Sequence, residues 1–249
     1  MAAIYFIWLG SGRARRCHVA PEGQLLDRAA KVGLPAAPGA ILLDEFYRVC
    51  LEKDLAEMAG GRAVIPDAEL LHATLFHSVR LPRFNRPVAV DLVAPDANGD
   101  GDGDDDGDGD GASIELPPRR LIDANQPDEL AQALVAAWNA AAQRDARRDV
   151  FLVEDIVAAE QRGRAHTHDE SAIDYVKLYG DGETNLALPA LSGWRKPDAA
   201  LPPYQRRLQM LLRGVRYTFG PGRWAVDWAD DGKVCHITRI APVASSPPA

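Results

Sequence analysis

An acidic side chain between apolar residues is the first feature of this sequence that could take part in chemistry. Asp227 lies inside the β-type run Trp224–Trp228, between Val226 and Trp228. A lone carboxylate is costly to bury among apolar neighbours. We therefore expect a cation or an arginine to face Asp227.

A second candidate group is the run His166-Thr167-His168-Asp169. Imidazoles and carboxylates are ligands of transition metals, and His166 and His168 would share one face of a strand. A third, suitably spaced group of ligands is missing from the sequence. We therefore expect no transition metal and favour solvent-facing polar residues, while a metal at these histidines stays an open alternative.

A third candidate is the Gly/Asp-rich run Asp96–Gly111, whose opening residues have the spacing of an EF-hand calcium loop. The twelfth position of such a loop is Gly107, where a bidentate glutamate is required. The run contains no large apolar side chain that could be buried. We expect residues 95–112 to form a disordered acidic loop without a structural calcium.

Composition excludes several classes of function. The chain has 249 residues and a net charge of −8, but eight of its 36 acidic residues lie in Asp96–Gly111, which leaves 28 acidic against 28 basic residues elsewhere. A balanced remainder without a basic cluster indicates no nucleic-acid partner. The apolar opening of nine residues is too short to cross a membrane, so no membrane partner is expected. Three cysteines without metal-type spacing indicate reduced thiols and a cytoplasmic location.

Periodicity predicts an α/β chain of the α+β type. Helical spacing of apolar residues is typical of 127–147 and 205–217, and shorter helices are expected at 25–32 and 45–59, the latter capped by Asp44. Strands are expected near the N-terminus and at 41–43, 87–93, 150–153, 173–178, 224–228 and 234–240. Asp230-Asp231-Gly232 is a turn signal between the last two strands. Trp194, in a proline-rich connection, is a candidate for burial.

Five blocks of the sequence, in order, resemble the ATP-binding, ATP-grasp-type domain of phosphoenolpyruvate synthase and pyruvate phosphate dikinase. One of them is PVAVDLV at 87–93, which resembles the family's V-A-V-R-S-S strand. The segments AVDWA and ITRIAPV resemble the D-I-E-W-A and L-Q-x-R-P-V strands that end that domain, and G-L-P at 33–35 resembles its entrance. The run 150–170 is similar to the family's V-V-V-Q-x-M-V-x-A-x-x-A-G-V-A-F-T-x-D-P segment. Gly180, Gly182 and Glu183 match its G-L-G-E. The resemblance implies a two-lobed domain with mixed or antiparallel sheets and packed helices.

The resemblance also implies a nucleotide site. It places Gly23, Gly180, Gly182, Glu183 and Arg239 at nucleotide-binding positions. Asp227, with Glu183, stands where the family holds its magnesium ion.

The sequence departs from this pattern where the family binds phosphate. Glu22 stands in place of the phosphate-binding lysine, Asp91 in place of an arginine, Arg239 in place of a glutamine and Ala241 in place of an arginine. No trace of the family's lid segment is found between residues 94 and 120. Because cations balance the triphosphate in this chemistry, Mg-ATP is expected to bind weakly if it binds.

The sequence thus leaves two functions open. The favoured one is a degenerate nucleotide-binding domain that serves as a non-catalytic binding or regulatory module; the alternative is an active ATP-dependent phosphotransferase subunit with a separate phosphoacceptor protein. Either could require a protein partner that supplies the family's missing domains. We expect an N-terminal lobe at 1–94, the acidic loop at 95–112, a C-terminal lobe at 113–243 and a tail at 244–249.

Overall fold

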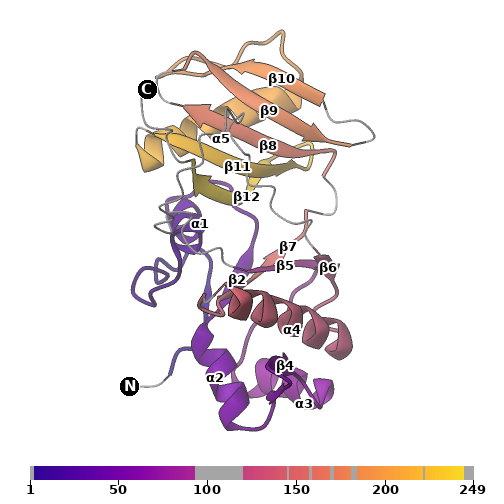
Figure 1. Cartoon of the computed structure of the whole chain (residues 1–249). Helices are drawn as coiled ribbons and strands as arrows, with labels where there is room; N and C mark the ends of the chain where they lie inside the picture. The colour runs from indigo at the N-terminus through magenta and orange to yellow at the C-terminus, as the bar shows by residue number, and fades with distance from the viewer. Residues whose placement is uncertain are drawn as a thin grey trace, which may run out of the picture.

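The fold consists of two five-stranded antiparallel sheets that lie one above the other, with helices below the lower sheet, between the sheets and behind the upper sheet (Figure 1). It is described by a computed structural model that covers residues 3–92, 120–144, 146–156, 159–168, 171–180, 184–220 and 222–243. The Gly/Asp-rich run 96–111, which the sequence predicts to be a disordered loop, lies outside these described residues. The predicted α+β class with antiparallel sheets is confirmed.

The first sheet has the strand order β1-β2-β7-β5-β6. Its strands are β1 (Phe6–Trp8), β2 (Gly39–Leu42), β5 (Val88–Leu92), β6 (Arg120–Ile122) and β7 (Val150–Glu154). Residues along β2 and β7 are almost all buried, since both faces of this sheet are covered. One face packs on α2 (Asp44–Glu52), α3 (Ala68–Ala73), the π-helical turn η1 (Thr74–Ser78) and α4 (Pro127–Gln143).

The second sheet has the order β10-β9-β8-β11-β12. Its strands are β8 (Gln161–His168), β9 (Ile173–Tyr179), β10 (Thr184–Pro189), β11 (Arg223–Asp230) and β12 (Cys235–Pro242). Burial alternates along β8, as expected when one face of a sheet is covered and the other is more open. The covered face packs on α5 (Pro203–Phe219), which lies behind the sheet in Figure 1.

The two long helices form as their periodicity predicts. Leu130, Leu134 and Trp138 of α4 are buried, and so are Leu208, Leu212 and Val215 of α5. Helix α5 ends at Gly220, whose φ of 81° is a conformation that favours glycine. The predicted hairpin is also confirmed, because β11 and β12 pair as adjacent antiparallel strands.

Helix α1 (Pro21–Lys31) follows β1 of the first sheet and packs against β12 of the second sheet. Apolar residues of β1, β2 and β7 on one side and of β8, β11 and β12 on the other belong to one continuous core. The first sheet and the second sheet therefore share buried contacts.

Three expectations are wrong. The strand at 150–153 is expected with the later strands in the C-terminal lobe at 113–243, but it belongs to the first sheet, because its uninterrupted apolar run pairs between β2 and β5 and is buried on both faces. Helix α2 ends at Glu52 and is followed by a short hairpin of β3 (Glu57–Ala59) and β4 (Arg62–Val64), and the Asp44 side chain does not cap it. Trp194 is fully exposed, because it lies in a surface turn, and Arg213 donates to the carbonyl groups on either side of it.

Candidate functional site: a buried arginine between two sheets

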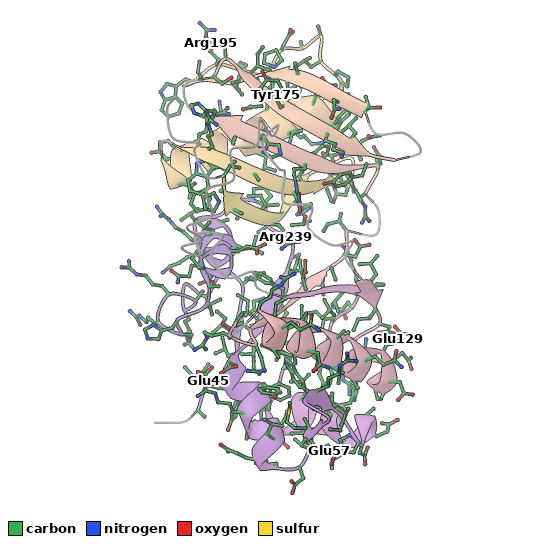
Figure 2. All side chains as sticks on the ribbon, viewed as in Figure 1. Glu45, Glu57, Glu129, Tyr175, Arg195 and Arg239 are labelled. Atoms are coloured by element: carbon green, nitrogen blue, oxygen red, sulfur yellow. The ribbon has the colours of Figure 1, made fainter. Side chains whose placement is uncertain are left out.

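Arg239 lies where the two sheets and α1 meet, and Figure 2 shows it at the junction of the upper and lower halves of the molecule. Its Nε donates to Oε1 of Glu22 over 2.7 Å, and its Nη2 donates to Oε2 over 3.3 Å. Its Nη1 lies 3.1 Å from Oδ2 of Asp91. We call Glu22, Asp91 and Arg239 the Arg239 cluster.

Each member of the Arg239 cluster comes from a different layer. Arg239 is on β12 of the second sheet, Asp91 is on β5 of the first sheet, and Glu22 is on the face of α1 that is turned toward the core. The exposed fractions of the three side chains are only 6–14 %. The cluster therefore links three layers through charges that are largely removed from water.

Arg239 keeps its charge in this environment. Burial by itself lowers the pKa of Arg239, but the hydrogen bond to Glu22 and the charges of Glu22, Asp91 and Asp227 act in the opposite direction and outweigh it. The pKa of Arg239 is raised as a result. The Arg239 cluster thus holds one cation and two carboxylates.

Asp227 is paired with Arg164, as the sequence predicts for a carboxylate among apolar neighbours. The two residues are opposite each other in the register of β11 and β8. Arg164 donates from Nε over 2.7 Å and from Nη2 over 3.0 Å, one bond to each carboxylate oxygen. This hydrogen bond is the main reason that the pKa of Arg164 is raised. Because Arg239 stands on the other side of Asp227 in the β12 register, the carboxylate lies between two arginines.

Of the two candidate magnesium ligands, the structure describes Asp227 and not Glu183. Both oxygens of Asp227 accept hydrogen bonds from Arg164, so a metal ion at Asp227 would have to compete with the guanidinium. Glu183, the other candidate ligand, and Gly182 lie outside the described residues. Within the described ranges, no group of three or more histidine, cysteine, aspartate or glutamate side chains has the arrangement of a metal site.

The other candidate residues that the structure describes are two glycines, Gly23 and Gly180, and two histidines, His166 and His168. A Cβ atom at Gly23 would lie 2.4 Å from Cγ1 of Val19, so this glycine allows α1 to pack closely. Gly180 follows the end of β9, and a Cβ atom there would contact nothing. Burial, followed by the charge of Arg164, lowers the pKa of His166, so its imidazole is neutral at pH 7. His168 is on the same face of β8, and Asp169 lies outside the described residues.

The pairing within the Arg239 cluster is the feature that sequence reasoning misses. The family resemblance treats these residues one at a time: it implies added negative charges at Glu22 and Asp91 and a replacement cation at Arg239. The available signal lies in the resembled pattern: two positions that are basic in that pattern are acidic here, and a position that is neutral in it is arginine here. Charge changes of opposite sign at three positions of one site indicate an internal ion pair.

The geometry has a direct electrostatic consequence for anions. The Arg239 cluster carries a net charge of about −1, and the Asp227–Arg164 pair is neutral. Opposite charges at close range in a partly buried site attract by several kcal/mol, and like charges repel by a similar amount. A phosphate group that approached Arg239 would therefore meet two carboxylates that already occupy the guanidinium.

Comparisons with known proteins give similarity in structure but not in sequence. No protein-family model and no curated protein sequence matches the chain. The chain is similar to D-alanine–D-alanine ligase from Bacillus anthracis, complexed with ATP, with a TM-score of 0.47 and 9 % identity over 94 % of this chain and 56 % of the ligase. For the ligase from Helicobacter pylori the TM-score is 0.42, with 12 % identity over 87 % of this chain and 49 % of the ligase.

A third similar structure is the biotin carboxylase domain of 2-oxoglutarate carboxylase from Hydrogenobacter thermophilus, complexed with MgADP. Its TM-score is 0.41, with 14 % identity over 89 % of this chain and 39 % of that chain. These ligases and carboxylases are ATP-grasp enzymes. The chain spans about half the length of the two ligases. Similarity at these TM-scores and identities is too low to carry a function over to this chain.

In the part of the chain that the structure describes, no helix is both long enough and apolar enough to span a membrane.

Proposed function

We propose that this chain is a degenerate ATP-grasp-type domain of the phosphoenolpyruvate synthase and pyruvate phosphate dikinase type, and that it serves as a non-catalytic binding or regulatory module. The sequence blocks support the type of domain. The Arg239 cluster is the observation that carries the non-catalytic interpretation, because Glu22 and Asp91 bind the arginine at which phosphate oxygens would otherwise be expected.

Two phosphate contacts of the resembled domain have no counterpart at Glu22 and Asp91. A charge-assisted hydrogen bond to phosphate contributes about 1.5–3 kcal/mol. The absence of two such contacts, at the positions of Glu22 and Asp91, lowers affinity by roughly two to four powers of ten. The hydrogen bonds between Arg164 and Asp227 further oppose magnesium, because the metal must displace a bidentate guanidinium.

The test is a calorimetric titration with Mg-ATP, together with an assay for ADP release. The wild type is compared with a double variant, Asp227→Ala with Glu183→Ala, and with a control double variant, Glu52→Ala with Glu57→Ala. Glu52 and Glu57 are exposed acids at the end of α2 and in β3, and Figure 2 shows Glu57 at the lower end of the molecule, away from Arg239. The control therefore removes the same number of carboxylates without touching the candidate site.

We expect the wild type to bind Mg-ATP with a dissociation constant of about 1 mM or weaker, and to release no ADP. Low-micromolar binding by the wild type and the control, lost in the Asp227/Glu183 variant, would refute the proposal. Such a result, together with ADP release, would instead support the active phosphotransferase.

A third variant tests the Arg239 cluster itself. The combination Glu22→Lys with Arg239→Gln restores the charges that the family has at these two positions. The net charge of the three positions changes from about −1 to about zero, with Asp91 retained, and a cation stands at position 22. Mg-ATP should bind this variant at least about tenfold more tightly than the wild type, since one regained charge-assisted contact exceeds about 1.4 kcal/mol.

A further inference from the structure

A hollow of about 600 Å³ lies on the outer side of α1, where this helix meets the N-terminal loop and one end of β11 and β12. Its walls include Arg15 from the loop, Arg28 and Lys31 from α1, and Trp224 from β11. This volume is in the range of about 300–1,000 Å³ that is typical of small-molecule pockets. We call it the α1 pocket.

The α1 pocket is separate from the Arg239 cluster. Residues three and four apart share one side of a helix, and Gln24, Arg28 and Lys31 follow that spacing along the pocket side of α1. Glu22, Leu26 and Ala29 are on the buried side, where Glu22 reaches Arg239. One helix therefore has a buried side that faces the two sheets and a second side that faces the pocket.

The loop that forms the edge of the α1 pocket is held in place by Asp27. This carboxylate is buried and accepts hydrogen bonds from the backbone N–H groups of Gly10, Gly12 and Ala14 at 2.8, 3.0 and 3.0 Å. Gly12 has a φ of 69°, and a Cβ atom there would lie 2.4 Å from Nζ of Lys31. The glycine thus provides both the backbone conformation and the space in which the lysine ammonium lies.

The charges of the pocket do not cancel. Asp27 is the acidic residue in its wall, and three amide groups already satisfy that carboxylate. Among the described residues, Arg15, Arg28 and Lys31 form no ion pair with a carboxylate. The pocket therefore has an excess of about two positive charges, which favours an anion.

The pocket lining also contains apolar and aromatic residues. Trp224 packs against Phe219 with 5.3 Å between ring centroids, and its Nε1 donates to the carbonyl oxygen of Gly220 over 3.4 Å. The end of α5 also orients Arg28, which donates to the carbonyl oxygen of Thr218 over 2.8 Å and lies 5.4 Å from the Phe219 ring centroid. Leu25 and Pro242 complete an apolar surface beside the cations.

We infer that the α1 pocket binds a small organic anion whose phosphate or carboxylate group contacts Arg15, Arg28 and Lys31 and whose flat apolar part lies against Trp224. Cations in the last turn of a helix complement its dipole, and this accounts for Arg28 and Lys31 alone. It does not account for Arg15, which comes from the loop, or for the tryptophan, which comes from β11. Convergence of three separate segments on one hollow is the arrangement of a binding site.

The experiment uses phenyl phosphate and benzoate as probes, each titrated into the full-length protein at low ionic strength and followed by calorimetry and by tryptophan fluorescence. Lys31→Gln and Arg15→Gln each remove one pocket charge from an exposed position. Arg16→Gln is the matched control, because Arg16 is an exposed arginine of the same loop that does not line the pocket. Comparison of the two probes distinguishes a phosphate ligand from a carboxylate ligand.

We expect at least one probe to bind with a dissociation constant of about 1 mM or tighter. Binding should weaken about tenfold in Lys31→Gln and in Arg15→Gln, remain unchanged in Arg16→Gln, and weaken with added salt. Binding should also persist in the Asp227→Ala, Glu183→Ala double variant, which separates this site from the proposed nucleotide site. The inference is overturned if neither aromatic anion binds, or if both pocket variants bind like the wild type.

Discussion

Replacement of Arg239 by methionine leaves Glu22 and Asp91 in the same place without their cation. The exposed fraction of the arginine side chain is 6 %, and those of the carboxylates are 7 and 14 %. Removal of one partner from a buried ion pair typically costs about 3–5 kcal/mol. A chain of this size loses about 2–4 °C of Tm per kcal/mol, so Arg239→Met should lower the Tm by about 6–20 °C.

The decrease in Tm caused by Arg239→Met should depend on pH, because Glu22 and Asp91 can be protonated. Like charges without a cation favour proton uptake in the folded state. The folded variant then binds more protons than the unfolded chain, so its stability falls as the pH rises. The Tm difference between Arg239→Met and the wild type should therefore be largest near pH 7–8 and should shrink toward about pH 4.

Thermal denaturation followed by circular dichroism, at several pH values, measures this difference. Arg195→Met serves as a control, because Arg195 is an exposed arginine near the far end of the second sheet (Figure 2). The triple variant Glu22→Gln, Asp91→Asn, Arg239→Met should be more stable than Arg239→Met, since no uncompensated charge remains. A Tm of Arg239→Met equal to that of Arg195→Met at every pH would refute the reasoning.

Three further outcomes are expected from burial and close packing. Gly23→Val should destabilise the fold by about 1–3 kcal/mol in urea denaturation, because a Cβ atom has no room there, while Gly180→Ala should be nearly neutral. Trp138→Ala should cost about 3–5 kcal/mol and Trp194→Ala about 0.5 kcal/mol or less, since the first ring is buried and the second is fully exposed. NMR titration should place the pKa of His166 below the value of about 6.5 for an unperturbed imidazole. Because the unfolded chain then binds this proton more readily, the Tm should fall as the pH drops below about 6.5, and it should fall less in His166→Asn.

Elements with strong periodicity can be predicted from the sequence alone. Helices α4 and α5 bury the apolar faces expected of them, and the turn Asp230-Asp231-Gly232 joins two paired strands. Local chemistry decides these elements, because an amphipathic helix or a glycine turn is specified within a few residues. The hydrogen bonds between Asp227 and Arg164 agree with the same kind of argument, since a carboxylate on a half-buried strand needs a cation.

Features that depend on distant residues cannot be predicted in the same way. Glu22 and Arg239 are 217 positions apart in the sequence and share two hydrogen bonds, and no local pattern reveals that contact. The strand at 150–153 follows α4 in the sequence, which favours a place among the C-terminal strands, yet it pairs between β2 and β5. The residue type of Trp194 favours burial, but the carbonyl groups beside it are held by Arg213 and its ring lies in solvent.

Ion pairs of arginine and aspartate are common in this molecule, so the Arg239 cluster has to be distinguished from ordinary scaffolding. Arg207 binds the buried Asp230, and Arg216 binds the buried Asp174. Both arginines are on α5 and attach it to the sheet on which it already packs. The Arg239 cluster differs because it joins α1 and both sheets. A ligand that displaced Asp91 from Arg239 would therefore weaken a contact between the two sheets, and one that displaced Glu22 would weaken the contact of α1 with the second sheet. Binding at Arg239 and the relative position of the sheets are coupled for that reason, and a phosphate group could remain there only if its contacts exceeded the several kcal/mol that the internal carboxylates contribute.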